Sequence, residues 1–141
     1  MATWHEIHQR VIIEMNFSLK WTLNGQGGRK NSPLWEEVEE CLSKLKHKAG
    51  TLTLDAFESG NIGPDTLQVR AESGNYMLTL GKETDNDYKV RFYWDPSLTS
   101  EKLLILGDYW SERQLIKDFA LVVRVFKEFF DTGNVSADIL N

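Results

Sequence analysis

The sequence of 141 residues has one cysteine, three prolines and no apolar run near the roughly 20 residues that a membrane-spanning helix needs. A single cysteine leaves no internal disulfide and no multi-cysteine zinc site, which is typical of a reducing compartment. The first residues lack the basic and then apolar layout of a signal peptide. We therefore expect a cytoplasmic protein without a membrane span.

Basic residues are also the minority, with 16 Lys and Arg against 21 Asp and Glu and a net charge of -5. This balance argues against nucleic-acid binding and favours a basic partner. Hydrophobic residues make up 41% of the chain and aromatic residues 11%, too many for a disordered protein. With no linker, repeat or low-complexity segment, residues 1–141 are expected to form one domain.

Alternation of apolar and polar residues predicts a long strand over residues 13–23, which begins at Ile13 and ends at Leu23. The glycine-rich run 24–28 follows, and we interpret it as a flexible connection to a helix. Its glycines resemble a phosphate cradle only superficially, because they lack the spacing of the known nucleotide-binding loops.

Two helices are predicted from their start and stop signals. The first has Ser32 as N-cap and ends at Gly50, with apolar residues at helical spacing between them. The second begins at a capping box formed by Ser111 and Gln114, carries a broad apolar face and stops at Gly133.

Between the helices, short alternating segments and turn residues predict an antiparallel meander. The expected strands cover residues 51–57, 67–71, 76–80, 88–94 and 102–106, with turns at 59–65 and 72–75. The predicted fold is therefore α+β, an antiparallel sheet of about five to six strands with two main helices in the order β-α-β-β-β-β-β-α.

No catalytic or metal-binding constellation stands out in the sequence. His5 and His8 would share one face of a helix, but two histidines without a third ligand are a weak metal signal. Cys41 falls at an apolar helical position, which predicts a buried and unreactive thiol. We expect no enzyme activity, no metal and no cofactor.

Aromatic residues beside carboxylates are the most suggestive feature of the chain. Tyr and Trp provide contact area at low entropic cost, and neighbouring acids provide charge complementarity, so such pairs are common at protein interfaces. Alternation along 88–94 places Tyr93 on the exposed face. The predicted partner-binding residues are Glu83, Asp85, Asp87, Tyr93, Asp95, Asp108, Tyr109, Trp110 and Glu112.

The segment 120–135, ALVVRVFKEFFDTGNV, carries a family resemblance. A closing helix that ends in an aromatic pair and continues as acid-Thr-Gly resembles the C-terminus of bacterial immunity proteins from polymorphic-toxin and contact-dependent growth-inhibition loci. The Gly-Asp-Tyr-Trp step at 107–110 agrees with that layout, whereas the Pro and Trp that often follow the glycine are absent. The resemblance implies a small antidote that binds a cognate toxin domain, frequently a nuclease with a basic cleft, and neutralises it.

Two other functions are compatible with the same residues. A small-ligand-binding or regulatory module would enclose a pocket lined by Trp21, Trp94 and Phe126. An enzyme would need an acid-base pair such as Asp108 and Glu112 across a cleft. The antidote is the preferred hypothesis.

Overall fold

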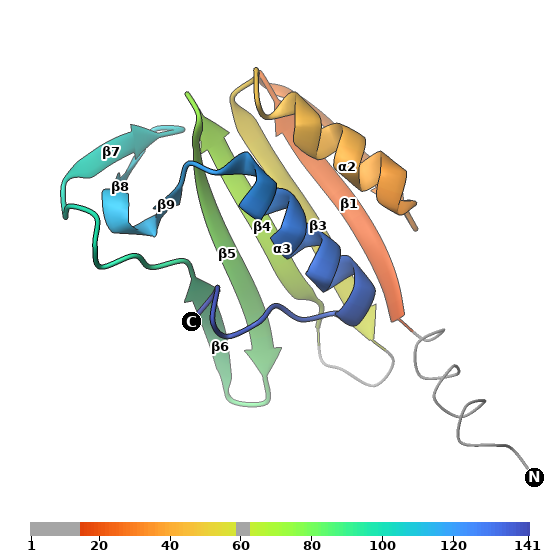
Figure 1. Ribbon diagram of the computed structural model, residues 1–141. Helices are drawn as coiled ribbons and strands as arrows, with labels where there is room; N and C mark the ends of the chain where they lie inside the picture. The colour runs from red at the N-terminus through yellow and green to blue at the C-terminus, as the bar shows by residue number, and fades with distance from the viewer. Residues whose placement is uncertain (1–14, 59–62) are drawn as a thin grey trace, which may run out of the picture.

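The computed structural model describes residues 15–58 and 63–141 (Figure 1). An antiparallel sheet runs in the order β2-β1-β3-β4-β5-β6, and the short β9 also pairs with β5. The strands of this sheet are β1 (Met15–Leu23), β2 (Gln26–Asn31), β3 (Gly50–Glu58), β4 (Asp65–Glu72), β5 (Asn75–Thr84), β6 (Asp87–Phe92) and β9 (Leu115–Ile116). Strands β7 (Lys102–Ile105) and β8 (Asp108–Ser111) form a separate two-stranded ribbon.

Helices α2 (Trp35–Lys44) and α3 (Phe119–Thr132) lie side by side on one face of the main sheet (Figure 1). A short 3-10 turn, η1 (Glu112–Gln114), precedes β9. The predicted α+β class is confirmed. The structure has more strands than predicted, because β2, β8 and β9 are additional.

The main core lies between the sheet and the two helices. Leu19, Leu54, Leu67 and Leu80 stand opposite one another across β1, β3, β4 and β5, and none is more than 4% exposed. Phe126 of α3 is fully buried against them. Burial of each such side chain contributes about 1.5–3 kcal/mol, so this row fixes which face of the sheet the helices cover.

The glycine-rich run after β1 is a hairpin and part of a strand, which corrects the prediction of a flexible connection. Asn24 and Gly25 have φ angles of 49° and 82° and form the two-residue turn that favours positive φ. The chain then returns as β2, with Gly28 opposite Trp21. A Cβ on Gly28 would lie 2.3 Å from Cζ2 of Trp21, so glycine is needed beneath the indole. Ile13 lies outside the described residues.

The first helix is shorter than predicted at both ends. Ser32 has a φ of 49° and lies before the helix, whose N-cap is Leu34. The side chain of Glu37 accepts the backbone N–H of Leu34 at 2.9 Å. The helix ends at Lys44, and Gly50 already belongs to β3, where a Cβ would lie 1.9 Å from the carbonyl oxygen of Thr22. Gly50 therefore allows close approach of two strands and does not stop the helix.

The capping box of Ser111 and Gln114 exists but begins η1 and not the long helix. The Gln114 side chain accepts the Ser111 N–H, and the Ser111 hydroxyl accepts the Arg113 N–H, both at 3.3 Å. β9 follows η1 directly and pairs with β5, and α3 starts only after Asp118, whose side chain accepts the Ala120 N–H. The predicted stop at Gly133 is confirmed, with a φ of 77°.

Several smaller predictions have clear outcomes. Cys41 is buried, as predicted, and burial raises the pKa of its thiol. The turn at 72–75 is confirmed, with positive φ at Ser73 and Gly74. The strand expected over 88–94 ends at Phe92. The predicted turn at 59–65 falls largely outside the described residues, because the structure leaves out 59–62.

Candidate functional site

The β7-β8 ribbon has one face against the sheet and one face toward solvent. Leu103, Ile105 and Trp110 pack with Met77 of β5 and Leu115 of β9 in a second, smaller core. This core lies on the sheet face that the helices do not cover, because Met77 alternates with the buried Leu78 of the helix face. The ribbon is therefore anchored to the body of the protein over its whole length.

On the outer face of the ribbon, Leu104 and Tyr109 are direct cross-strand partners. Leu104 is 51% exposed and Tyr109 is 68% exposed. The sequence prediction placed Tyr109 and Trp110 together in a recognition surface. The structure separates them, with Tyr109 on the outer face and Trp110 on the inner one, where its indole N–H is buried without a hydrogen-bond partner in the described residues.

Arg70 of β4 joins the ribbon to the sheet. Its Nη1 lies 3.3 Å from Oδ2 of Asp108, and its guanidinium group lies over the Trp110 ring at 5.7 Å from the centroid. Arg70 Nε also donates to Gln68, which in turn donates to the Thr53 hydroxyl. This chain of polar contacts crosses β3, β4 and β8 and fixes Asp108 at the edge of the ribbon.

The turn of the ribbon is held by a second contact. Leu106 has a φ of 52°, which is unfavourable for a bulky side chain by about 1–2 kcal/mol. Its backbone N–H donates to Oε1 of Glu72 at 3.1 Å, and its side chain packs on the second core. The surrounding contacts offset the strained backbone, so the turn has one defined position.

Two of the predicted acids make local hydrogen bonds that favour their charged forms. Asp95 accepts the hydroxyl and the backbone N–H of Ser97, and the hydroxyl first and then the N–H lower the pKa of its carboxyl. The Thr99 hydroxyl donates to Glu112 and lowers the pKa of that carboxyl, with a further contribution from Lys117. Asp108 and Glu112 thus each have their own basic partner, Arg70 and Lys117.

The remaining predicted acids lie at the other end of the sheet. Glu83, Asp85 and Asp87 surround the β5-β6 turn, at the lower end of the sheet in Figure 1. From Met77, which the ribbon covers, to Thr84 is seven residues along β5, about 23 Å at the rise of a strand. The predicted site residues therefore form two groups.

The prediction that Tyr93 is exposed is wrong. Tyr93 lies just beyond β6, is half-buried and packs against the main core. Burial, with a smaller effect of Asp95, raises the pKa of its phenol. The sequence pattern correctly placed Tyr93 on the opposite face from Phe92, although β6 ends at Phe92. The error lay in which face is exposed, because the helices and the C-terminal segment cover the face to which Tyr93 points.

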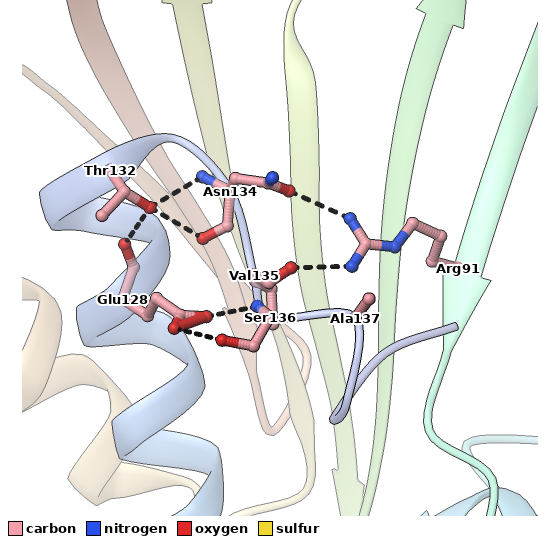
Figure 2. A pocket seen from close by; sticks show the side chains of 7 residues that line it. All are labelled: Arg91, Glu128, Thr132, Asn134, Val135, Ser136 and Ala137. Carbon is pink, nitrogen blue, oxygen red and sulfur yellow. Dashed lines mark hydrogen bonds between the residues drawn. The ribbon is translucent and has the colours of Figure 1, made fainter.

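A hollow of about 420 Å³ lies where that C-terminal segment crosses the sheet (Figure 2). Arg91 projects into it from β6. Its Nη1 donates to the Asn134 side chain at 2.9 Å, its Nη2 donates to the carbonyl oxygens of Val135 and Leu140, and its Nε donates to Leu140 again. Four hydrogen bonds from one guanidinium group hold the segment in place.

The opposite wall of the hollow is also hydrogen-bonded internally. Glu128 of α3 accepts the backbone N–H and the hydroxyl of Ser136, and the Thr132 hydroxyl donates to the Glu128 carbonyl oxygen at 2.8 Å (Figure 2). The polar groups that line the hollow are thus used for folding the C-terminal segment. The sequence analysis missed this arrangement, although an arginine inside a strand was a signal for it.

The pocket proposed for a small ligand does not form. Phe126 is fully buried in the main core, whereas Trp94 is 45% exposed and contacts Phe92 of the second core. Trp21 covers Gly28 at the β1-β2 hairpin. Trp21 and Phe126 both pack in the main core, whereas Trp94 lies beside the second core, so the three side chains do not line one pocket.

Metal ligands do not gather in groups of three or more among residues 15–58 and 63–141. His5 and His8 lie outside this range. Neither α2 nor α3 has the length and apolar character to cross a membrane, as far as the structure describes the chain.

The chain belongs to a family of unknown function, DUF6911, whose model matches residues 16–139. Its fold is similar to that of a hypothetical protein from Neisseria gonorrhoeae, with a TM-score of 0.69 at 18% identity over 86% of this chain and 90% of that one. It is also 33% identical over 76 residues to the tryptophan prenyltransferase ComQ of Bacillus spizizenii. That match covers 50% of this chain and 26% of the prenyltransferase, so the chain spans about a quarter of the relative's length.

Proposed function

We propose that this protein is a cytoplasmic immunity protein that binds a toxin domain, a basic nuclease, and neutralises it through the outer face of the β7-β8 ribbon. The observation that carries the proposal is the exposed pair of Leu104 and Tyr109 on a ribbon whose other face is anchored in a core. A rigid aromatic anchor loses little entropy on binding, which is why such residues dominate binding energies.

The charges around the ribbon support a basic partner. Asp108 lies next to Tyr109 with 62% of its side chain exposed, and the chain as a whole has a net charge of -5. Such a surface would steer a basic domain toward the ribbon and raise the association rate. The resemblance of residues 120–135 to the closing segment of immunity proteins favours the same class of partner.

The second acidic group fits the same interface. Glu83 lies on the helix-free side of the sheet, the side on which the ribbon packs. An interface of ordinary size buries about 800 Å² on each partner, which corresponds to a patch roughly 30 Å across. A footprint of this size that extends along β5 from the ribbon, about 23 Å away, would include the β5-β6 turn, where Glu83, Asp85 and Asp87 provide a rim of charge.

The experiment is to read the gene immediately upstream and, if it encodes a large secreted protein, to co-express the C-terminal domain of that protein with this chain. We expect a complex that survives size-exclusion chromatography and rescues growth of cells that express the toxin domain. Tyr109→Ala should weaken the complex by about 2 kcal/mol or more, as a central aromatic anchor does. Leu34→Ala is the matched control, because Leu34 is 64% exposed and lies at the start of α2.

Charge reversal distinguishes the contribution of the acidic rim to binding from that of the Tyr109 anchor. Replacing Glu83, Asp85 and Asp87 by lysine should slow association and leave the dissociation rate nearly unchanged. A complex unaffected by both Tyr109→Ala and this charge reversal would move the interface elsewhere. The absence of any complex would refute the proposed function.

A further inference from the structure

The two edges of the main sheet differ. At the β6 edge, Phe92 exchanges two backbone hydrogen bonds with Asn141, at 3.2 Å and 3.1 Å, so the C-terminal segment pairs with the last residue of β6. At the other edge, β2 pairs with β1 and with no other strand of the described residues. Five of the six residues of β2 are exposed. The second edge is therefore open within the described part of the chain.

The hairpin geometry shows which backbone groups of β2 are available. Leu23 and Gln26 flank a two-residue turn and exchange hydrogen bonds, and every second pair beyond them does the same. The N–H of Ser32 accordingly donates to the carbonyl oxygen of Phe17 at 2.9 Å. The N–H and C=O groups of the intervening residues, Gly27, Arg29 and Asn31, therefore point away from β1.

This edge is basic in an otherwise acidic protein. β2 contains Arg29 and Lys30 and no acid, and Lys20 is the cross-strand neighbour of Arg29. Lys20 pairs with Asp55 and Lys30 with Glu37, whereas Arg29 has no ion-pair partner among the described residues. Lysine and arginine on an edge oppose pairing with a like-charged strand. Arg29 and Lys30 therefore favour pairing of the β2 edge with an acidic strand.

We propose that the β2 edge binds an extended acidic segment of another protein as an additional antiparallel strand. The main chain of that segment would bond to Gly27, Arg29 and Asn31, which is recognition by strand addition. Two consecutive carboxylate residues would stand opposite Lys30 and Arg29 on the two faces of the sheet. The next residue would be apolar and stand opposite Gly28, where it would contact the Trp21 indole that lies over the glycine.

A second copy of this protein is a poorer occupant of the edge. Antiparallel pairing of two β2 strands brings Arg29 and Lys30 of both copies together, and like charges on facing strands are destabilising. The proposed segment is also distinct from the partner of the β7-β8 ribbon. Tyr109→Ala should therefore leave its binding unchanged.

The probe is a fluorescein-labelled peptide of sequence Thr-Thr-Glu-Glu-Val-Thr-Thr, titrated with the full chain and followed by fluorescence anisotropy. The control peptide has lysine at both glutamate positions. We expect the acidic peptide to bind at least about tenfold more tightly than the lysine peptide, because the same cations attract one and repel the other.

Arg29→Pro tests the hydrogen bonds. Proline at this position removes an N–H that points outward and leaves the pairing of β2 with β1 intact. Arg29→Glu tests the charge and keeps the N–H, and Lys102→Glu is its matched control on the ribbon. Each change at Arg29 should raise the Kd about tenfold or more, whereas Lys102→Glu should change it less than about twofold.

Amide hydrogen exchange locates the bound peptide. Binding should slow exchange at Gly27, Arg29 and Asn31 and leave Gly28 and Lys30, which already face β1, nearly unchanged. The proposal is overturned by equal affinity for the two peptides, by undiminished binding to both Arg29 variants, or by protection at another surface. The absence of binding at millimolar peptide concentration would likewise overturn the proposal. Arg29 and Lys30 would then serve to keep the β2 edge from pairing with other strands.

Discussion

Arg91 holds the carbonyl oxygen of Leu140 between two of its nitrogens, at 3.1 Å from Nε and 2.8 Å from Nη2. The two residues are 49 positions apart, and Leu140 is fully buried. Because the guanidinium group is planar and presents several donors in a fixed arrangement, it can bind this oxygen and its neighbours at once. One strand residue thus fixes the path of the C-terminal segment.

Arg91→Met should lower the free energy of unfolding by about 2–4 kcal/mol, because it leaves buried carbonyl oxygens without their charged donor. Arg91→Lys should recover only part of this loss, since an ammonium group lacks the fork geometry. Urea denaturation followed by circular dichroism measures both. Lys89→Met is the control, and an effect of equal size there would contradict the assignment.

The adjacent glycines of β2 provide a second test. Gly28→Ala should destabilise the protein by about 1–3 kcal/mol, because its Cβ would overlap the Trp21 indole. At Gly27 the nearest contact of an added Cβ is the Trp21 carbonyl oxygen at an ordinary 3.6 Å, so Gly27→Ala should cost much less. Thermal unfolding of both variants gives the difference. In the background of Trp21→Ala, the cost of Gly28→Ala should largely disappear.

Asp55 carries the third prediction, since it is only 5% exposed although it lies on the helix-free face of β3. Thr66 donates its hydroxyl to Oδ1 of Asp55 at 2.6 Å, and Lys20 approaches Oδ2 at 3.4 Å. Thr66→Val keeps the shape and removes the donor, so it should lower the free energy of unfolding by about 1–3 kcal/mol. Thr79→Val, on the same face, should change it by less than about 0.5 kcal/mol. Chemical denaturation measures the free energy of unfolding of both variants, and equal losses would contradict the role of the Thr66 hydroxyl.

The fourth prediction concerns pH. Glu112 has a pKa below its ordinary value of 4.5, first because of the Thr99 hydroxyl. A carboxyl with a depressed pKa stabilises the folded state above its unfolded pKa, and this contribution is lost as the pH falls through the folded pKa. Thr99→Val should raise the Glu112 pKa toward 4.5, and the stability of the variant should fall less between neutral and acidic pH. An NMR titration of the Glu112 carboxyl measures the shift, and an unchanged pKa would refute the role of Thr99.

The sequence predicted the fold best where side chains repeat with a clear period. Alternation identified β1, and the apolar face of α3 with Gly133 located the closing helix. β2 was not predicted because Gly27 and Gly28 have no side chains that could show alternation, although Asn24-Gly25 is by itself a hairpin signal. The capping box at Ser111 was read as the start of α3, but pairing of β9 with β5 overrode that local preference.

The candidate site was predictable in composition but not in arrangement. The exposure of Tyr109, Asp108 and the acids of the β5-β6 turn follows from their type and their place near turns, whereas the side chain of Glu112 is only 17% exposed. That Trp110 faces inward depends on Met77 and Leu115, which come from strands that the sequence does not order. The positions of Arg70 and Arg91 depend on contacts with Asp108 and Leu140, respectively 38 and 49 residues away. Such distant pairings leave no local periodic signal.

The covering of β6 by the C-terminal segment has a consequence during translation. Residues 134–141 follow all the described strands in the chain, so during synthesis β6 is made before the residues that pair with Phe92. Nascent chains of neighbouring ribosomes would meet through the edge of β6. Pairing of Asn141 with Phe92 therefore ends the interval in which this end of β6 can pair with another chain.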